Sequence, residues 1–173
     1  MEQSRLTLRR FELSDLDDFL KWASDPRVTR YLRWDAVASK GEALSLLEKK
    51  FVSHPWRLSV CLDGRSTGYV SARPGTGDDR CRVHVSYAIA AEHWGKGVAT
   101  AALRMALPRV FGEFLEVRRV EALVEVENGA SARVLEKVGF VKEGLLRKYC
   151  YCKGEIKDMF IYSFLVTDLD TLL

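Results

Sequence analysis

The sequence predicts a mixed α/β fold with one sheet of six or seven strands. Two features indicate it: strand-like segments joined by tight turns lie toward both ends of the chain, and two central units run from a strand into a helix. The composition agrees, because 173 residues with 47% hydrophobic and 29% charged residues are typical of a globular protein and exclude a collagen-like, low-complexity or disordered chain. No internal repeat or Pro/Gly/Ser-rich linker divides the sequence, so we expect a single domain over residues 1–173.

The first third of the chain is predicted to form a strand followed by two or three short helices. Leu6–Phe11 is the expected strand. Helix starts are marked by side chains that can accept hydrogen bonds from the first helical amides: Ser14, Asp25 before Pro26, and Ser39 with Glu42 in a capping box.

The rest of the chain alternates strands and helices. A hairpin is predicted from Trp56–Leu62 to Thr67–Ala72 across Asp63-Gly64, because both turn residues tolerate positive φ. The later elements are, in order, a strand over Arg82–Ile89, a helix over Val98–Phe111, a strand over Val120–Val126, a helix over Ala130–Val138 ending at Gly139, and a closing hairpin from Val141–Tyr151 to Ile156–Phe164 across Lys153-Gly154.

The charge pattern argues against nucleic acid as a partner. Lys and Arg total 27 against 24 Asp and Glu, and the resulting +3 is spread along the chain instead of forming a basic run. A mildly basic balance still suits a compact anionic ligand.

No apolar run approaches the ~20 residues of a membrane-spanning helix, and Met1–Phe11 lacks the apolar stretch of a secretory signal. We therefore expect a soluble, cytoplasmic protein that does not associate with membranes.

The cysteines give no sign of a metal site. Cys61, Cys81, Cys150 and Cys152 show no CxxC spacing, and no histidine lies near them in the sequence. Zinc sites and redox pairs depend on such spacings. We predict reduced, mostly packed thiols and no bound metal.

Residues 87–100 carry the strongest functional signal. A predicted strand runs into a turn that contains Gly95 and Gly97, and a helix follows from Val98. The first backbone N–H groups of a helix have no partners within it and, together with the helix dipole, attract phosphate. The glycines let a ligand approach the backbone closely, and Lys96 adds positive charge. The turn therefore predicts an anionic ligand.

Three phosphate-binding motifs are compatible with such a turn in principle. A Walker P-loop is excluded, because Gly97 follows Lys96 where Ser or Thr is required. A dinucleotide fingerprint, GxGxxG, is half met, since Gly95 and Gly97 fit and Thr100 stands at the third glycine. The pyrophosphate turn of acyl-CoA-dependent acetyltransferases, polar-x-x-Gly-x-Gly/Ala, is matched at Gly97 and Ala99.

Further segments support the third motif. Trp94–Ala99 reads WGKGVA, Asn128–Ser131 reads NGAS and Leu135–Phe140 reads LEKVGF. With Leu6–Arg9 and the segment 143–158, these resemble the GNAT acetyltransferase superfamily, and within it most the RimJ/RimL-like branch, over almost the whole chain. The sequence departs from the wider superfamily at Trp94, where Gln or Arg is usual.

The resemblance implies a mostly antiparallel sheet with helices on both faces, whose central strands splay to form a cleft for acetyl-CoA. It also implies N-acetyltransferase activity, in which an amine attacks the thioester directly without a covalent enzyme intermediate. The residues that it assigns to acetyl-CoA are Tyr87, Ala88 and Ile89 beside the pantetheine arm, Gly95, Lys96, Gly97, Val98, Ala99 and Thr100 at the pyrophosphate, and Asn128 and Ser131 near the pantetheine and sulfur.

Candidate catalytic residues are marked less sharply. Many members of the superfamily use a tyrosine on the later helix to protonate the leaving thiolate, but Leu135 stands there, so the resemblance points to Ser131 with Tyr87 behind it. The acceptor amine, with a pKa of about 10, must lose a proton. His84, Ser86 and Glu125 lie on the two strands expected to flank the cleft, with His84 and Ser86 on one face of their strand, and a water relay is an equal alternative. The histidine, the glutamate and the helix-cap residues also fit purely structural roles.

The acceptor cannot be deduced from the sequence: a protein N-terminal amine, a lysine side chain and a small amine all fit, and so do a monomer and a homodimer. Two other functional classes stay open, an acyl-CoA-binding regulatory module without turnover and an NAD-dependent oxidoreductase. Residues that would shape an acceptor site, if exposed, are the aromatic Trp22, Tyr31, Trp34, Trp56 and Tyr149 and the acidic Asp35 and Asp158.

Overall fold

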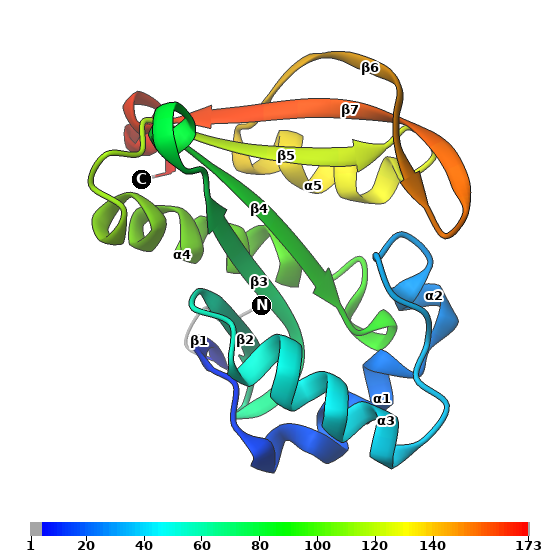
Figure 1. Cartoon of the computed structure of the whole chain (residues 1–173). Helices are drawn as coiled ribbons and strands as arrows, with labels where there is room; N and C mark the ends of the chain where they lie inside the picture. The colour runs from blue at the N-terminus through cyan, green and yellow to red at the C-terminus, as the bar shows by residue number, and fades with distance from the viewer. Residues whose placement is uncertain (1–4, 173) are drawn as a thin grey trace. The chain divides into compact units, whose positions relative to one another are not determined.

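The computed structural model describes residues 5–172, in which seven strands and five α-helices are joined by short helical turns (Figure 1). The strands are β1 (Leu6–Arg10), β2 (Arg57–Leu62), β3 (Arg65–Pro74), β4 (Arg82–Ile89), β5 (Arg119–Glu125), β6 (Val141–Cys152) and β7 (Glu155–Leu165). The α-helices are α1 (Leu16–Ala23), α2 (Pro26–Thr29), α3 (Lys40–Leu46), α4 (Val98–Glu113) and α5 (Gly129–Val138). The short helical turns are η2 (Leu13–Asp15), η3 (Leu47–Val52), η4 (Gly77–Cys81), η5 (Ala91–His93) and η6 (Val166–Leu172).

The strands form a mixed sheet in the order β1-β2-β3-β4-β5-β7-β6. The pairs β1–β2, β2–β3, β5–β7 and β6–β7 are antiparallel, and β4–β5 is parallel. β3 and β4 are also antiparallel, because Ala90 N donates to Thr67 O while Gly75 N donates to Arg82 O. The prediction of a mixed sheet of six or seven strands is therefore confirmed. No helix in the described part of the chain is long and apolar enough to cross a membrane.

The parallel pair has a short register. Arg82–His84 of β4 pair with Arg119–Glu121 of β5. Both strands continue beyond this pairing, β4 to Ile89 and β5 to Glu125. The splay of the central strands beyond this register stays a prediction.

The chain divides into two compact units, which are described separately below. The first unit runs up to Ser71 and includes Tyr87–Ala102; the second consists of Ala72–Ser86 and the chain from Leu103 onward. Three elements, β3, β4 and α4, contribute residues to both units.

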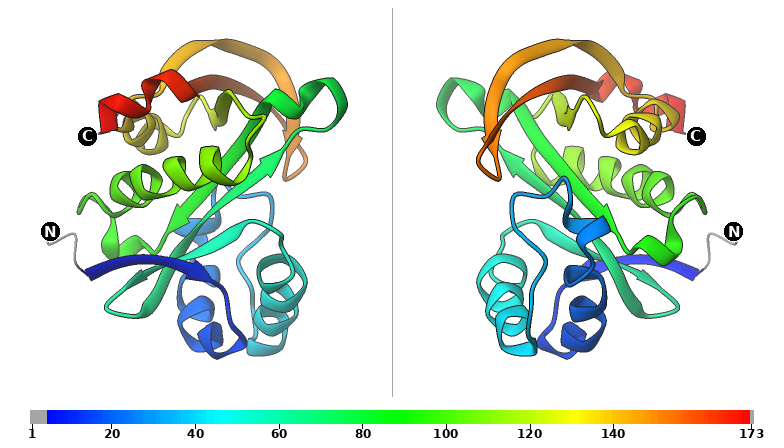
Figure 2. Two further views of the ribbon diagram at one scale, coloured as in Figure 1. Left: turned by 90° about the vertical axis from the view of Figure 1, so that its left-hand side faces the viewer. Right: turned by 90° about the vertical axis from the view of Figure 1, so that its right-hand side faces the viewer.

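The first unit has an aromatic core. α1 and α3 lie side by side in both figures of the ribbon (Figures 1 and 2). α1 buries Phe19, Trp22 and Ala23, because their spacing of three and four places them on one helical face. The ring of Phe19 lies 4.7 Å from that of Trp22 and 4.8 Å from that of Phe51, in edge-on geometry. Phe51 in turn packs against Tyr69 of β3 at 5.4 Å, which fixes the helices to the sheet.

In the second unit, α4 and α5 lie side by side (Figure 2). Arg104 Nη2 of α4 donates to Lys137 O at the end of α5 over 2.8 Å. α4 packs against β7 through Phe111 and Phe164, whose ring centroids are 6.4 Å apart. α5 ends at Gly139, which is its C-cap residue, as the sequence predicts. The φ of Gly139 is 113°, in the left-handed region that glycine adopts readily.

Two of the predicted helix caps are confirmed. Ser39 Oγ accepts from Glu42 N at 3.2 Å, at the start of α3. Asp25 Oδ1 accepts from Arg27 N at 2.9 Å, with proline at the first position of α2. These bonds satisfy N–H groups that have no partner inside the helix.

The predicted helix start at Ser14 is wrong. The chain first forms the η2 turn, and α1 begins at Leu16. Ser14 Oγ bonds to the Glu12 carboxylate at 3.2 Å instead of capping α1. The Asp15 carboxylate instead closes the capping box of the η2 turn: its Oδ2 accepts from Glu12 N at 3.0 Å, and Arg9 holds the same carboxylate at 2.6 Å.

Candidate functional site

The turn between β4 and α4 has the conformation that its glycines require. Gly95 and Gly97 have φ values of 72° and 77°, in the left-handed region that other residues rarely adopt. A Cβ atom built on either glycine would meet no atom within 4 Å. These glycines therefore serve a backbone conformation that opens onto free space, and not close packing against the protein.

The backbone of α4 presents donors behind this turn. The first bond within the helix is from Ala101 N to Gly97 O at 3.0 Å. By helix geometry, the amides of the preceding residues, Val98, Ala99 and Thr100, have no partner inside the helix. Lys96 lies exposed beside them. The turn thus offers amide donors, a helix dipole and one positive charge to an anion.

The end of β4 packs closely against β3 along one of its edges. Ala90 N donates to Thr67 O at 2.7 Å. A Cβ on Gly68 of β3 would lie 2.1 Å from Ala88 O, so the two backbones approach more closely than any other residue at that position would allow. Because alternate residues of a strand direct their N–H and C=O groups to opposite edges, those of Tyr87 and Ile89 face away from β3. Of the three residues predicted beside the pantetheine arm, Tyr87 and Ile89 thus have their backbone groups on the edge away from β3, and Ala88 has its carbonyl toward β3.

One contact at this edge was missed by sequence reasoning. Trp94 Nε1 donates to Ile89 O at 2.7 Å, which brings the residue before the glycine turn back to the last residue of β4. A tryptophan in a motif position gives no sequence signal of such a bond. The structure therefore places Tyr87–Ile89 and Gly95–Thr100, all in the first unit, on one continuous piece of chain closed by the indole.

In the second unit, Asn128 has a clear local role. Its Oδ1 accepts from Ser131 N at 3.2 Å, so it caps α5, and its own N donates to Glu125 O at 2.8 Å. Ser131 lies in the first turn of α5 and is half-buried. Leu135 is fully buried, and its side chain has no proton to donate to a thiolate. The ligand roles of Asn128 and Ser131 stay predictions beside this capping role.

His84 and Glu125 occupy separate places on the sheet. His84 is half-buried and lies opposite Glu121 in the parallel register, while Glu125 is four residues further along β5. At about 3.3 Å per residue this separates the two levels by roughly 13 Å. They are therefore alternatives for accepting a proton and cannot act as a hydrogen-bonded pair. Glu125 is only 8% exposed, which is unusual for a carboxylate.

The neighbouring charges of the sheet are engaged with one another. Arg119 donates to Glu121 at 3.0 Å and to Glu143 at 2.6 Å, and Glu143 also accepts from Ser163 at 2.6 Å. These hydrogen bonds, first from the guanidinium and then from the hydroxyl, lower the pKa of Glu143 from 4.5 to about 2. Arg82 adds a further pair to Glu121 at 3.3 Å. The network has its partners within the protein, so we assign it a structural role.

The aromatic residues considered for an acceptor site differ in exposure. Trp22 and Trp56 are buried in the protein. Trp34 and Tyr31 are half-buried, with the Trp34 ring 6.3 Å from that of Trp22. Tyr149 is half exposed on β6. Only Tyr31, Trp34 and Tyr149 can therefore offer surface to an acceptor.

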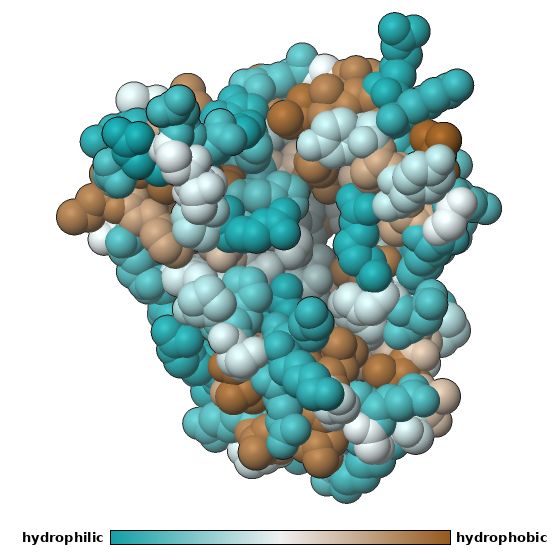
Figure 3. All heavy atoms as spheres, viewed as in Figure 1, coloured by the Kyte–Doolittle hydropathy of each residue, from teal (hydrophilic) through white to brown (hydrophobic). Residues whose placement is uncertain are grey.

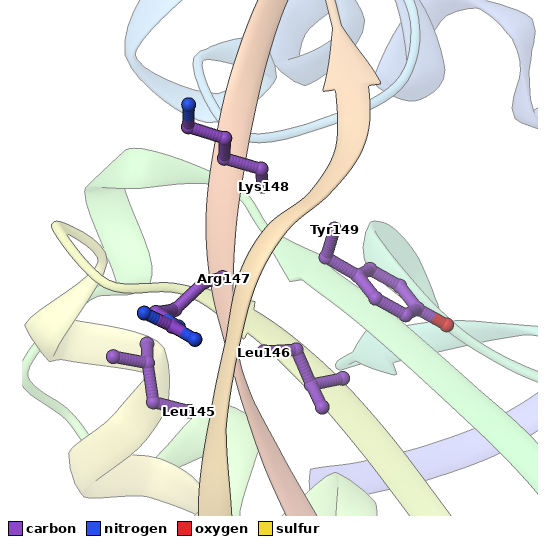
Figure 4. A pocket seen from close by; sticks show the side chains of 5 residues that line it. All are labelled: Leu145, Leu146, Arg147, Lys148 and Tyr149. Atoms are coloured by element: carbon purple, nitrogen blue, oxygen red, sulfur yellow. The ribbon is translucent and has the colours of Figure 1, made fainter.

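β6 carries a bulge that includes Tyr149. Leu145, Leu146, Arg147, Lys148 and Tyr149 line a shallow hollow, in which Leu146 and Tyr149 lie on one side of the ribbon and Leu145 and Arg147 on the other (Figure 4). The surface over β6 and β7 is partly apolar (Figure 3). The exposed apolar residues of these two strands include Val141, Leu145 and Ile156.

The acidic candidates Asp35 and Asp158 also differ. Asp158 Oδ1 accepts from Lys148 N at 2.6 Å, and Lys148 has a φ of 48°. Asp158 therefore holds the β6 bulge in its left-handed conformation, a role that the sequence did not suggest. Asp35 is exposed.

The cysteines of the described residues form no disulfide bonds. Within residues 5–172, Cys61, Cys81, Cys150 and Cys152 are free, and only Cys61 and Cys152 are buried. Burial raises the pKa of the Cys61 thiol, which makes it a weak nucleophile. The same described residues contain no cluster of His, Cys, Asp and Glu arranged to hold a metal ion.

Comparison with known proteins supplies the chemical context. A family model described as an acetyltransferase (GNAT) domain matches residues 5–141. The chain is 32% identical over 168 residues to the uncharacterized N-acetyltransferase p20 of Bacillus licheniformis, covering 93% of each chain. Its structure resembles RimJ of Mycobacterium smegmatis in complex with CoA-disulfide, with a TM-score of 0.77 and 26% identity over 95% of this chain and 83% of that chain. It also resembles spermidine N-acetyltransferase of Vibrio cholerae in complex with CoA and spermine, with a TM-score of 0.76 and 25% identity over 96% of this chain and 98% of that chain.

Proposed function

Since this chain belongs to the GNAT acetyltransferase family and is an acetyl-CoA-dependent N-acetyltransferase, we propose that it is a RimJ/RimL-like member that acetylates a primary amine. The observation that carries this proposal is the turn at Gly95–Gly97. Two left-handed glycines open onto free space in front of the first amides of α4, directly after the strand end at Ile89. That arrangement suits a pyrophosphate followed by an extended arm.

The parts of acetyl-CoA are assigned as follows. The amides of Val98, Ala99 and Thr100 hold the pyrophosphate, with Lys96 as a charge partner. The edge of β4 at Tyr87–Ile89 pairs with the pantetheine arm. Asn128 and Ser131 approach the pantetheine and sulfur, as the family resemblance implies. Acetyl-CoA supplies the acetyl group as an activated thioester.

The reaction is a direct attack of the amine nitrogen on the thioester carbon. The N–C bond forms first and gives a tetrahedral intermediate, whose negative oxygen is stabilised by the backbone N–H near Ile89, and the C–S bond breaks as this intermediate collapses. The amine proton passes to Glu125 or His84, directly or through water. The leaving thiolate takes a proton from Ser131, with Tyr87 as the alternative, and the hydroxyl donor regains its proton from water.

The acceptor is proposed to be a cationic amine. The carboxylate of Glu125 is nearly buried. The pKa of Lys157 is raised, first by its hydrogen bond to Glu155 and then by the nearby charges of Glu127 and Glu125. Glu125 and Glu127 thus add negative charge near the end of β5 beyond the Glu155 that pairs with Lys157, and this charge favours an ammonium group. A protein N-terminus, a lysine side chain and a polyamine all fit this description. The cytoplasmic location and the absence of nucleic-acid and membrane partners stay predictions.

The first experiment measures thiol release from acetyl-CoA with a panel of amines, alongside the acetyl-CoA affinity of two variants. Gly97→Trp is expected to fill the open space before the amides and to weaken acetyl-CoA binding more than a hundredfold. Gly97→Ala imposes the same left-handed strain with one methyl group and is expected to weaken binding less than fivefold. Wild-type binding without release of thiol for any amine would favour an acyl-CoA-binding module. Equal affinities in Gly97→Trp and wild type would overturn the site.

A further inference from the structure

The indole of Trp94 closes the connection between β4 and the glycine turn. Its N–H bond to Ile89 O, at 2.7 Å, spans a segment otherwise held by two backbone bonds, from His93 N to Ala90 O and from Trp94 N to Ala91 O. The ring is 51% exposed, so core packing does not explain its position. The hydrogen bond is the specific contact that fixes this side chain.

The accepting carbonyl lies on a defined edge of β4. Ala90 N bonds to Thr67 O and Arg82 O accepts from Gly75 N, so even-numbered residues of this strand direct their backbone groups to β3. Ile89 has the opposite parity, and its carbonyl therefore lies on the other edge. This is the edge to which the proposed function assigns the pantetheine arm.

We propose that Trp94 is a positioning residue for acetyl-CoA, an inference that rests on the proposed function. Acetyl-CoA must meet two sets of protein groups at once, the turn amides with its pyrophosphate and the strand edge with its pantetheine arm. The Trp94–Ile89 bond ties these two sets at a fixed spacing before the ligand arrives. Fixing both sets in advance removes part of the ordering entropy that the second contact would otherwise cost.

The bond, and not the ring, is predicted to matter. Trp94→Phe keeps an aromatic ring and removes the N–H donor. Trp94→Gln removes the ring and restores an N–H donor of similar reach, as in the residue usual at this position in the wider superfamily. We expect the acetyl-CoA affinity measured by titration calorimetry to fall about tenfold in Trp94→Phe and to return to within threefold of wild type in Trp94→Gln.

A fragment of the ligand separates positioning from local damage. The nucleotide 3′-phospho-ADP carries the pyrophosphate without the pantetheine arm, so its affinity should stay within about twofold of wild type in both variants. Tyr151→Phe, which removes one exposed O–H donor from β6 in the second unit, is the matched control and should bind both ligands as wild type does.

Three results would overturn this proposal. Wild-type acetyl-CoA affinity in Trp94→Phe would show that the bond does not position the ligand, and equal losses for acetyl-CoA and 3′-phospho-ADP would show damage to the turn alone. Both leave the proposed function intact, whereas a wild-type protein that binds neither ligand overturns both proposals. If Trp94→Phe shows no cooperative thermal unfolding and is therefore not folded, Trp94→Leu is used in its place. Equal acetyl-CoA affinities of Trp94→Leu and Trp94→Gln would then overturn the proposal.

Discussion

Glu143 of β6 accepts hydrogen bonds from side chains of both β5 and β7. It accepts from Arg119 and from Ser163, and its pKa of about 2 lies below the ordinary 4.5. A carboxylate whose pKa is lowered on folding stabilises the protein above its unfolded pKa and loses that contribution as the pH falls through the folded value. The stabilisation by Glu143 is therefore lost as the pH falls from about 4.5 to about 2. Because the side chain is 41% exposed, screening limits the contribution to about 1 kcal/mol.

We predict that Glu143→Gln lowers the free energy of unfolding by about 1 kcal/mol at pH 7. The difference from wild type should shrink below pH 4.5 and disappear near pH 2, as measured by urea unfolding at a series of pH values. Glu116→Gln, which breaks a pair with Arg80 in which both side chains are mostly exposed, is the control and should change little. A Glu143→Gln effect that does not vary with pH would contradict this electrostatic account.

At the residue scale, sequence reasoning located the positions that depend on local chemistry. Gly95 and Gly97 were identified because a left-handed turn before a helix requires glycine, and Asn128 because its side chain favours turns and caps. It missed the Trp94–Ile89 bond and the Asp158 bond to the β6 bulge, because each joins atoms whose approach depends on how the strands and turns fold. The roles of His84, Glu125 and Ser131 stay predictions for the same reason.

At the scale of elements, the packing of β3 against β4 depends on Gly68. A Cβ there would lie 2.1 Å from Ala88 O and 2.9 Å from Ile89 Cα, both backbone atoms that cannot turn aside. Gly68→Ala must therefore separate the strands, and we expect it to cost about 1–3 kcal/mol of stability. The shift also moves the end of β4, so acetyl-CoA affinity should fall at least tenfold by titration calorimetry.

The neighbouring turn supplies the control for Gly68. Gly64 has a φ of 78°, and a Cβ there would meet no atom within 4 Å. Gly64→Ala thus introduces backbone strain of about 1–2 kcal/mol without a clash. It should melt at a lower temperature than wild type and bind acetyl-CoA unchanged. If both variants bind equally, the close approach at Gly68 does not position the strand end.

Element boundaries were predicted best where a single side chain sets them. The strand over Arg82–Ile89 matches the prediction, and α5 ends at Gly139 as expected. β3 extends to Arg65–Pro74, beyond the predicted Thr67–Ala72, because pairing with β2 on one edge and β4 on the other outweighs local preference. The first helix start failed at Ser14 because the chain first forms the η2 turn, which is closed by the Asp15 carboxylate that Arg9 of β1 holds.

At the scale of the whole molecule, the order of strands and helices along the chain was predictable, and the arrangement of the sheet was not derivable from periodicity alone. Hairpin turns such as Asp63-Gly64 make sequence neighbours pair, which explains β2–β3 and β6–β7. The crossing that inserts β7 between β5 and β6 joins distant segments, and no local pattern encodes it. The family resemblance, carried by Trp94–Ala99 and Asn128–Ser131, supplied that part of the expectation.

Acetyl-CoA is expected to stabilise the whole folded chain, because its proposed contacts exist only in the native state. At a hundredfold excess over its dissociation constant, this linkage adds about 2.7 kcal/mol to the free energy of unfolding. For a chain of this length, that corresponds to a rise in melting temperature of roughly 5–11 °C. Scanning fluorimetry with acetyl-CoA, CoA, NAD and ATP in parallel should show the rise with the first two alone. A rise with NAD alone would contradict the assignment of the Gly95–Gly97 turn to acetyl-CoA and return it to the dinucleotide fingerprint that its two glycines half match.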